Sequence, residues 1–451
     1  MLGRRLGFFA LSAVAFGVAS ASAAGCGSRT DVGKLDDDIA PTSTVDAGID
    51  VKPVKDAAPD NHVVYVPKGT KCVRGIADPV PPRFTIPSSS PPPPFPRPPQ
   101  VKFSGGPLLH RPTIIPMTFD GDDMRDEIED FVASIGCSDY WRTVMTDYGV
   151  GDAVSGTPIH LTEKPAAKIT DNQISLWLRK KIEAKEIPDP EDVIYAVYYP
   201  EETQILLDGQ RSCQTFGAYH YELELSDGTK RAYAIMPRCR GFGGLSDLDE
   251  LTVSSSHELT EASSDPFPSS DPAHQFPEPD GIAWSIASGS ENADMCAFDS
   301  DAYLSNSSYP FTVQRVWSNS SAFKGLDPCV PLPAGDYFGG SILFQDKVTI
   351  DVGEGPVQAT GMSLAVGATK TVQVRVFGGP GNIILSANDL AQSLGQPKSL
   401  ELTLSKTNGV DGDLLTLTIK RIGTTSYGFN PFVIRSQKQG RDKRWFGLVG
   451  D

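Results

Sequence analysis

The stretch Ser256–Pro266, with the sequence SHELTEASSDP, contains residues whose types and spacing suit metal-assisted hydrolysis. On a helix, His257 and Glu261 are four residues apart, so their side chains project from one face. Glu258 is rotated from that face by roughly 100°. In zinc peptidases with the pattern His-Glu-x-x-His, two side chains hold the metal and the intervening glutamate takes a proton from water. The stretch therefore predicts His257 and Glu261 as metal ligands, since carboxylates also bind zinc, and Glu258 as the catalytic base.

A third protein ligand would come from another part of the chain. Glu291 and Asp294 lie downstream in SGSENADMCAF, and Asp265 lies at the expected end of the helix. We favour Glu291, with Asp294 and then Asp265 as alternatives; His274, in the following loop, is a weaker candidate for the place of Glu291. One imidazole and two carboxylates would suit Zn²⁺ and would also accept another divalent cation, such as Mn²⁺ or Ca²⁺.

Some of these residues could have a purely structural role instead of binding a metal. Glu261 could pair with His257 across one turn of a solvated helix, which is worth only a few tenths of a kcal/mol. Upstream, Tyr219 and His220 in the segment GAYH could contact a substrate and polarise its carbonyl group. For His220 we favour the simpler interpretation, a histidine hydrogen-bonded within its own loop.

Hydrophobic periodicity and capping residues predict the elements that would position these side chains. PTIIPMTF and DVIYAVYYP are apolar enough for buried strands, and DDMRDEIEDFVASI has the apolar spacing of a helix. Thr170 begins a second helix, and Asp227-Gly228 marks the turn of a hairpin. The helix with the His-Glu-x-x-Glu pattern would begin at Ser246 and end at Asp265, before a proline. This order of elements is that of an α+β or an α/β domain, and we predict an α+β domain over residues 101–338.

A second domain is predicted over residues 340–451. Segments such as KTVQVRVFG and LLTLTIKRIG alternate apolar and polar residues, and turn dipeptides follow at Asn408-Gly409 and Asp411-Gly412. ANDLAQSLG is the one helical pattern among them. Short alternating strands with frequent turns are typical of an all-β, immunoglobulin-like sandwich. This part of the sequence contains neither His nor Cys, so we expect a binding or spacing module.

The N-terminus has the features of an export signal. Arg4 and Arg5 precede the apolar run LGFFALSAVAFGV, and small residues lead to Cys26. We predict a signal peptide over residues 1–25 and lipidation of Cys26, because the segment resembles the signals of bacterial lipoproteins. Gly27 after that cysteine resembles lipoproteins sorted to the outer membrane. Secretion after cleavage at an Ala-x-Ala-like site is the alternative.

Residues 26–100 are expected to form a disordered, flexible tether. The first part is rich in Asp, Ala, Pro and Thr and has too few apolar residues to form a core. The second part contains the run PSSSPPPPFPRPPQ, which favours an extended polyproline II conformation. Such a tether would hold the folded domains away from the membrane.

Charge and cysteine content narrow the functional class further. The formal net charge of −16 argues against nucleic-acid binding, which needs a basic surface. Of the seven cysteines, six remain when Cys26 is set aside. An even number in an exported chain indicates three disulfides, and the residues alone leave fifteen pairings open.

From Gly105 to Cys329, the sequence resembles the EXORDIUM or phosphate-induced family of secreted proteins with a zincin-like core. The resemblance rests on six segments in the same order: DVIYAVYYP, CQTFGAYHYE, YAIMPRC, SHELTEASSDP, SENADMC and VWSNSS. Ser264 stands where the family usually has threonine, and Asn292-Ala293 where Ile-Gly is more usual. The resemblance implies a metallopeptidase-like fold in which Glu261 is the residue that the family has at this position.

The resemblance also implies the disulfide pairs. Cys213 and Cys239 flank the hairpin, and Cys296 and Cys329 bracket the segment after the candidate third ligand. This leaves Cys72 to form the third disulfide with Cys137.

These observations predict an exported, lipid-anchored, metal-dependent hydrolase, with a peptidase as the first choice. Its partners would be the membrane, through the lipid, and a peptide or cell-surface polymer as substrate. The alternative is a non-catalytic surface binding or adhesion lipoprotein on a zincin-like scaffold.

Overall fold

The computed structural model describes residues 67–74, 80–87, 95–241, 244–277, 281–306, 309–344, 346–351 and 356–451. The predicted signal peptide and Cys26 lie outside these residues. Strands in several sheets dominate, with helices concentrated in the first part of the chain. No helix among the described residues is both long and apolar enough to cross a membrane.

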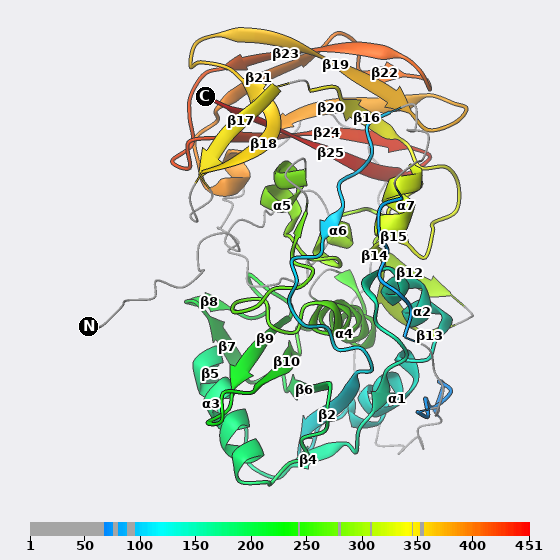
Figure 1. Cartoon of the computed structure of the whole chain (residues 1–451), viewed down its shortest axis with the longest axis vertical. Coiled ribbons are helices and arrows are strands. Elements are labelled where there is room, and N and C mark those ends of the chain that lie inside the picture. The colour runs from blue at the N-terminus through cyan, green and yellow to red at the C-terminus, as the bar shows by residue number, and fades with distance from the viewer. Residues whose placement is uncertain are drawn as a thin grey trace, which may run out of the picture.

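A mixed sheet forms the centre of the first part (Figure 1). β2 (Thr113–Phe119) and β6 (Val193–Tyr199) are buried parallel neighbours, as their apolar sequences predict. β10 (Lys230–Pro237) pairs in parallel with β6, and β9 (Tyr219–Glu224) pairs antiparallel with β10 at the edge. The predicted hairpin turn at Asp227-Gly228 connects β9 and β10. On the other side, the short strands β3 (Val154–Ser155) and β4 (Ile159–Leu161) pair with β2.

Helices cover both faces of this sheet because successive strand residues point to opposite sides. On one face, α3 (Asp171–Glu183) packs on Ile115, Tyr195 and their neighbours. Its N-terminus has the predicted capping box, formed by Thr170 and Gln173. The opposite face, with Ile114 and Ile194, packs against α1 (Arg125–Ile135), α2 (Asp139–Met145), the 3₁₀ turn η1 (Thr146–Tyr148) and α4 (Asp247–Ser264).

α4 is the helix with the His-Glu-x-x-Glu pattern, and its ends are those that the sequence predicts. The Ser246 side chain accepts a hydrogen bond from the backbone of Asp249, and the helix ends at Asp265. From Glu250 onward every side chain of α4 is buried. α4 packs on β9, β10 and β13 (Tyr309–Gln314), so this polar helix lies in the interior.

Short elements complete the first part of the chain. Two helices, α5 (Ile282–Ser288) and α6 (Asp294–Ala297), follow α4 and lie between it and the C-terminal sheets in Figure 1. The remaining elements are β1 (Val101–Lys102), β5 (Lys168–Thr170), β7 (Gln204–Leu207), β8 (Gln210–Arg211), β11 (Phe276–Pro277), β12 (Tyr303–Asn306), β14 (Val316–Trp317), α7 (Asn319–Lys324) and β15 (Cys329–Val330).

Two facing sheets form the C-terminal part (Figure 1). One has the order β16 (Gly339–Ile342), β19 (Thr369–Phe377), β23 (Leu414–Arg421), β21 (Leu400–Leu404). The other has the order β17 (Asp346–Asp351), β18 (Pro356–Ser363), β25 (Arg441–Gly450), β24 (Asn430–Lys438), β20 (Ile383–Asp389), β22 (Asn408–Gly409). Alternate residues of each strand point inward and share one apolar core, which the period-2 patterns predict.

Two local predictions in this part are wrong. ANDLAQSLG is not an α-helix: β20 runs through Asp389, and only a 3₁₀ turn, η4 (Gln392–Leu394), follows. Asn408-Gly409 is paired with the start of β20 rather than forming a turn, and the chain turns at Asp411-Gly412 instead, with Gly412 at a φ of 89°. Strand pairing outweighs the local preference of these residues.

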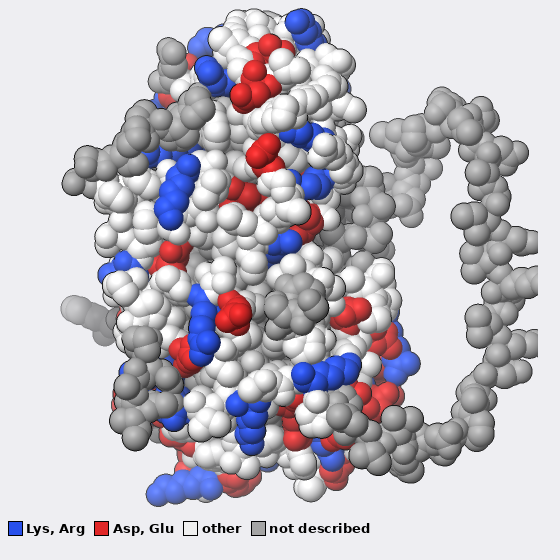
Figure 2. Space-filling view, turned by 90° about the vertical axis from the view of Figure 1, so that its right-hand side faces the viewer, with Lys and Arg blue, Asp and Glu red and all other residues white. Residues whose placement is uncertain are grey.

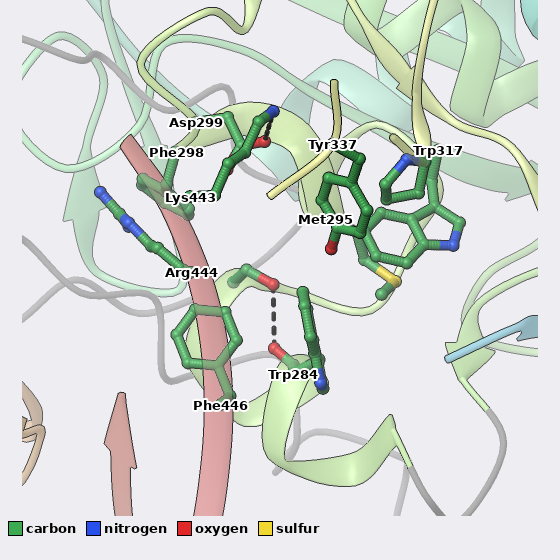
Figure 3. Close-up of a pocket in the computed structure, with 11 residues that line it drawn as sticks. Trp284, Met295, Phe298, Asp299, Trp317, Tyr337, Lys443, Arg444 and Phe446 are labelled. Carbon is green, nitrogen blue, oxygen red and sulfur yellow. Dashed lines mark hydrogen bonds and ion pairs between the residues drawn. The ribbon is translucent and has the colours of Figure 1, made fainter. Parts of the chain in front are cut away.

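The two parts are joined by a buried ion-pair network and are not separated by a spacer. The ammonium group of Lys443, on β25, lies 2.6 Å from Asp299, 2.9 Å from Asp301 and 2.9 Å from Asp327, all from the first part. Arg441 contacts Asp301 and Asp327 at 2.8 and 3.0 Å. Figure 3 shows Lys443 against Asp299 at one end of a small pocket, and Trp284 of α5 and Phe446 of β25 line its other end.

The predicted tether differs from the structure over its second half. Cys72 is buried and bonded to Cys137. The backbone N–H of Phe84 donates to Asp147 at 2.9 Å, and the ring of Phe95 stacks on Phe377 with centroids 3.8 Å apart. The described residues between 67 and 100 therefore pack on the folded parts, because a few apolar and cysteine side chains find partners there.

The structure contains three disulfides: Cys72–Cys137, Cys213–Cys239 and Cys296–Cys329. Cys213–Cys239 and Cys296–Cys329 are the pairs that the family resemblance implies, and Cys72–Cys137 is the pair that those two leave over.

Candidate metal centre

His257 and Glu261 meet in the interior of the first part. His257 Nε2 lies 3.1 Å from Glu261 Oε2, and neither side chain has any exposed surface. The other ring nitrogen, Nδ1, lies 3.1 Å from the amide oxygen of Gln314, whose Nε2 donates to the carbonyl oxygen of Ala293 at 2.8 Å. This network makes Nδ1 the protonated nitrogen and leaves the lone pair on Nε2, as in histidines that bind metals.

Asp294 is the acidic residue that joins this pair. Its Oδ1 lies 3.5 Å from His257 Nε2, and one ligand atom each from His257, Glu261 and Asp294 lie within 4.8 Å of one another. The backbone N–H groups of Ala293 and Asp294 donate to Glu261 Oε1 at 3.2 and 3.0 Å. The start of α6 is therefore fastened to α4, which directs the Asp294 carboxylate towards the same point.

Glu291, the favoured third ligand, lies in the same interior but on the side of His220. Its Oε1 is 3.3 Å from His220 Nε2. The geometry thus groups Asp294, rather than Glu291, with His257 and Glu261. The reason is the turn between the two residues: α6 begins at Asp294, three residues after Glu291, and the turn separates the two carboxylates.

Asp265 stays outside the group around His257. One of its carboxylate oxygens accepts the backbone N–H of Ala273 at 2.7 Å. Its backbone carbonyl lies 3.2 Å from His220 Nε2. The residue thus fastens the loop that follows α4, while its second oxygen, Oδ2, makes no hydrogen bond with the described residues.

His220 belongs to the buried cluster, so the prediction of a loop histidine is wrong. It is the second residue of β9, and its Nδ1 lies 3.3 Å from Glu258 Oε2 and 3.6 Å from Glu261 Oε2. His220, Glu258 and Glu261 form a second group whose ligand atoms lie within 4.8 Å of one another. Pairing of β9 with β10 turns this side chain towards α4, which no local pattern around His220 predicts.

Tyr219 points away from the cluster, because neighbouring strand residues face opposite sides of a sheet. Its ring lies in the core on the α3 side, 5.7 Å from Phe216 and 6.5 Å from Tyr233 between centroids. A substrate contact by Tyr219 at this site is therefore ruled out in this fold.

His274 also lies away from the candidate ligands. Its ring packs against Phe103 and Tyr148, with centroids 5.0 Å apart in each case. Burial, helped by the charge of Arg83, lowers the pKa of His274 to about 3, so this side chain is neutral in the native protein. It is a buried apolar contact and does not replace Glu291.

The cluster holds an unusual concentration of buried charge. Burial raises the pKa of Glu258, which His257 and His220 partly offset. Burial likewise raises the pKa of Glu291, and it raises that of Asp265 together with the charge of Glu291. Burial alone would lower the pKa of His220, but the carboxylates of Glu291, Glu258 and Glu261 raise it well above its usual value. Each ionised carboxylate is thus costly here unless a positive charge, from a protonated histidine or a bound cation, lies beside it.

The residues present fit a divalent cation. Glu258 Oε1, Glu261 Oε2 and Glu291 Oε1 are buried and accept no hydrogen bond from the described part of the chain. Ligand atoms about 2.0 Å from a tetrahedral zinc ion lie about 3.3 Å apart. The distances of 3.1 and 3.5 Å from His257 Nε2 to Glu261 and Asp294 agree with that spacing.

Comparisons with known proteins leave the family open. No family model matches the sequence, and no curated protein matches it. Among solved structures, titin domain M4 is 10% identical over 25% of this chain and 94% of its own length, with a TM-score of 0.15. Titin domain M3 is 12% identical over 25% of this chain and 97% of its own length, with a TM-score of 0.14. A Bacteroides ovatus GH5 xyloglucanase in complex with a heptasaccharide is 14% identical over 20% of this chain, with a TM-score of 0.14; this chain covers 17% of its length. Likenesses this small carry no conclusion about fold or function.

Proposed function

We propose that this protein is an exported, metal-dependent hydrolase that cleaves peptide bonds, with His257, Glu261 and Asp294 as the metal ligands. The observation that carries the proposal is the convergence of these three side chains, from α4 and α6, around one buried point next to Glu258. Zn²⁺ suits one imidazole and two carboxylates, and another divalent cation would also be accepted.

A cation held there would polarise the substrate carbonyl group and lower the pKa of a water molecule. Glu258 would take the proton of the attacking water and return it to the leaving amine. His220, 3.3 Å from Glu258, would hold that carboxylate in place and stabilise negative charge that develops on the substrate.

A zincin-like fold for residues 101–338 is part of the proposal. Supporting features are the motif helix α4 under a mixed sheet, and the antiparallel edge strand β9 beside it. An immunoglobulin-like fold for residues 340–451 and a lipid anchor at Cys26 complete it. The three disulfides suit an oxidising compartment outside the cytoplasm.

A second candidate is a non-catalytic surface-binding or adhesion lipoprotein, in which the motif helix, with or without a bound cation, serves only the fold. Complete burial favours this candidate: the side chains of His220, His257, Glu258 and Glu261 have no exposed surface in this conformation. A peptide would reach them only after the surrounding segments move.

Metal content and turnover test the two candidates. The metal in the purified protein is measured by mass spectrometry for the wild type and for His257→Ala, Glu261→Gln and Glu258→Gln. Cleavage of a quenched-fluorescent peptide library is measured for the same set. Glu250→Gln is the matched control, because Glu250 is a buried carboxyl on the same helix whose partner is Ser254, outside the cluster.

The hydrolase predicts about one cation per chain, loss of the cation in His257→Ala and Glu261→Gln, and loss of turnover with retained metal in Glu258→Gln. About one cation per chain in the wild type, with no turnover in the wild type or in any variant, favours a cation that only stabilises the fold. A folded wild-type protein that takes up no divalent cation contradicts the hydrolase and favours the non-catalytic binding protein.

A further inference from the structure

A second group of ligand atoms lies beside the first in the buried cluster. His220 Nδ1 is 3.3 Å from Glu258 Oε2 and 3.6 Å from Glu261 Oε2, and none of these three side chains has exposed surface. Both distances are close to the roughly 3.3 Å expected between ligand atoms of a tetrahedral zinc ion. The second group therefore has the geometry of the first, and Glu261 belongs to both.

Two oxygen atoms of this second group lack a hydrogen-bond donor. Glu258 Oε1 and Glu261 Oε2 are buried and accept no hydrogen bond from the described part of the chain. A buried carboxylate oxygen with neither a donor nor a cation beside it is costly. A metal ion is enclosed by its ligands, so the full burial of these atoms suits a cation and excludes a larger ligand.

The other ring nitrogen of His220 is held in the way that metal-bound histidines are held. Its Nε2 lies 3.2 Å from the backbone carbonyl oxygen of Asp265 and 3.3 Å from Glu291 Oε1. Both partners are acceptors, so Nε2 carries a hydrogen. Histidines that bind metals usually donate this second N–H to a carbonyl or a carboxylate, which fixes the ring and presents the lone pair of the other nitrogen to the ion.

The negative charge of the cluster exceeds the positive charge of one divalent cation. Five acidic side chains that are no more than 2% exposed surround the two histidines: Glu258, Glu261, Asp265, Glu291 and Asp294. If all were ionised, one divalent cation would offset fewer than half of these charges. On the molecular face shown in Figure 2, by contrast, acidic and basic side chains are interspersed. A second cation would bring the two signs of charge in the interior close to balance.

We infer that His220, Glu258 and Glu261 bind a second divalent cation, which inhibits the hydrolase. Glu261 Oε2 would be shared by the two ions, since it lies 3.1 Å from His257 Nε2 and 3.6 Å from His220 Nδ1. The second ion would take the place of the hydrogen between His220 and Glu258, and Glu258, as its ligand, would no longer accept the proton of the attacking water. The inhibition rests on the proposed function, whereas the binding site does not.

The second cation is expected to bind more weakly than the first. Two doubly charged ions that share one ligand in the interior repel each other, and this repulsion opposes the second binding step. The protein would therefore retain about one cation after purification and fill the second site only when free cation is in excess.

Zinc content and turnover of the purified full chain test this inference together. The chain is dialysed against buffer without metal and then against rising concentrations of Zn²⁺, and the zinc bound per chain is measured by mass spectrometry. Cleavage of the quenched-fluorescent peptide library is measured at the same concentrations. The variant is His220→Gln, whose amide can still donate to the Asp265 carbonyl but has no counterpart of Nδ1. His160→Gln is the matched control, because His160 pairs with Glu129 at 2.7 Å in a partly exposed pair outside the cluster.

Electron paramagnetic resonance with Mn²⁺ provides a second measurement that needs no variant. The ions of two-metal sites lie about 3.5–4 Å apart. At that distance their spins interact, so the hyperfine pattern of isolated Mn²⁺ should disappear as the second ion binds. Two Mn²⁺ ions per chain that both keep the isolated pattern would place the second ion elsewhere and overturn the inference.

We expect a second Zn²⁺ to bind in excess Zn²⁺ to the wild type and to His160→Gln, whereas His220→Gln binds only one. Filling of the second site should lower wild-type turnover about 100-fold or more, the usual contribution of a general base. A wild type that saturates at one cation, a second cation that His220→Gln retains, or turnover that the second cation does not change would each overturn the inference. Two cations without turnover at any Zn²⁺ concentration would support the second site and contradict the hydrolase, so the two failures are distinguishable.

Discussion

Replacement of Lys443 by methionine tests whether the network between the two parts determines stability. Lys443 is 3% exposed, and its ammonium group lies within 2.9 Å of carboxylate oxygens of Asp299, Asp301 and Asp327. Methionine keeps the length and the apolar stem of the side chain and removes only the charge. Among the described residues, Arg441 would then be the one cation in ion-pair contact with these aspartates, and it contacts two of them.

The size of the loss in unfolding free energy follows from the burial of Asp299, the carboxylate that loses its partner. Burial raises the pKa of Asp299 to about 6 even in the presence of Lys443, which lowers it in part. Asp299 has no other ion pair among the described residues. Removal of one partner from a buried pair costs about 3–5 kcal/mol, because an uncompensated charge is left in the interior. We expect Lys443→Met to lower the free energy of unfolding by that amount.

Urea unfolding of the purified chain, followed by tryptophan fluorescence, measures the change. Lys420→Met is the matched control, since Lys420 pairs with Glu401 at 3.0 Å but both side chains are about half exposed. Such a surface pair is worth at most about 1 kcal/mol. The double variant Lys443→Met/Asp299→Asn should recover part of the loss, because it removes the stranded carboxylate as well.

The pH dependence has a definite sign. In Lys443→Met the folded pKa of Asp299 lies even higher above its unfolded value, so the native state binds the proton more tightly. The difference in stability from the wild type should therefore shrink as the pH falls from 7 to 5. A cost for Lys443→Met no larger than that of Lys420→Met, or one that grows over this pH range, would refute the reasoning.

Three further predictions concern the first part of the chain. Burial lowers the pKa of His274 to about 3. Below about pH 6.5 the unfolded chain therefore binds a proton that the native protein excludes, and the free energy of unfolding falls as the pH falls. Between pH 7 and pH 5 this loss should be smaller by about 2 kcal/mol in His274→Leu than in the wild type. Chelation by EDTA should lower the melting temperature of the wild type but not that of Glu261→Gln, as calorimetry would show; equal shifts would exclude Glu261 as a ligand. Thr170→Ala, which removes the capping box of α3, should cost about 1 kcal/mol in urea unfolding, and a cost near zero would mean that the cap is dispensable.

Local chemistry made several features predictable from the sequence. The ends of α4 follow from a serine that caps its first turn and a proline that stops it, and both act within a few residues. The same is true of the hairpin at Asp227-Gly228 and of the buried strands β2 and β6. The placement of His257 and Glu261 on one face of α4 needs only the period of a helix.

Tertiary structure alone decided which other residues meet that face. Gln314, which orients His257, is 57 residues away, and no pattern in the sequence connects the two. His220 enters the cluster and Tyr219 does not, because the pairing of β9 with β10 determines which side of the sheet each one faces. The choice between Asp294 and Glu291 depends on where a four-residue helix begins.

The association of the two parts could not be predicted from the sequence either. Lys443 looks like any strand lysine, and Asp299, Asp301 and Asp327 look like loop aspartates more than a hundred residues earlier. The described residues between 67 and 100 have the composition of a tether, yet Cys72, Phe84 and Phe95 find partners on the folded parts. Helix caps, turns and periodicity act over a few residues and can be read from the chain, whereas burial, charge pairing and ligand geometry depend on which distant segments come into contact.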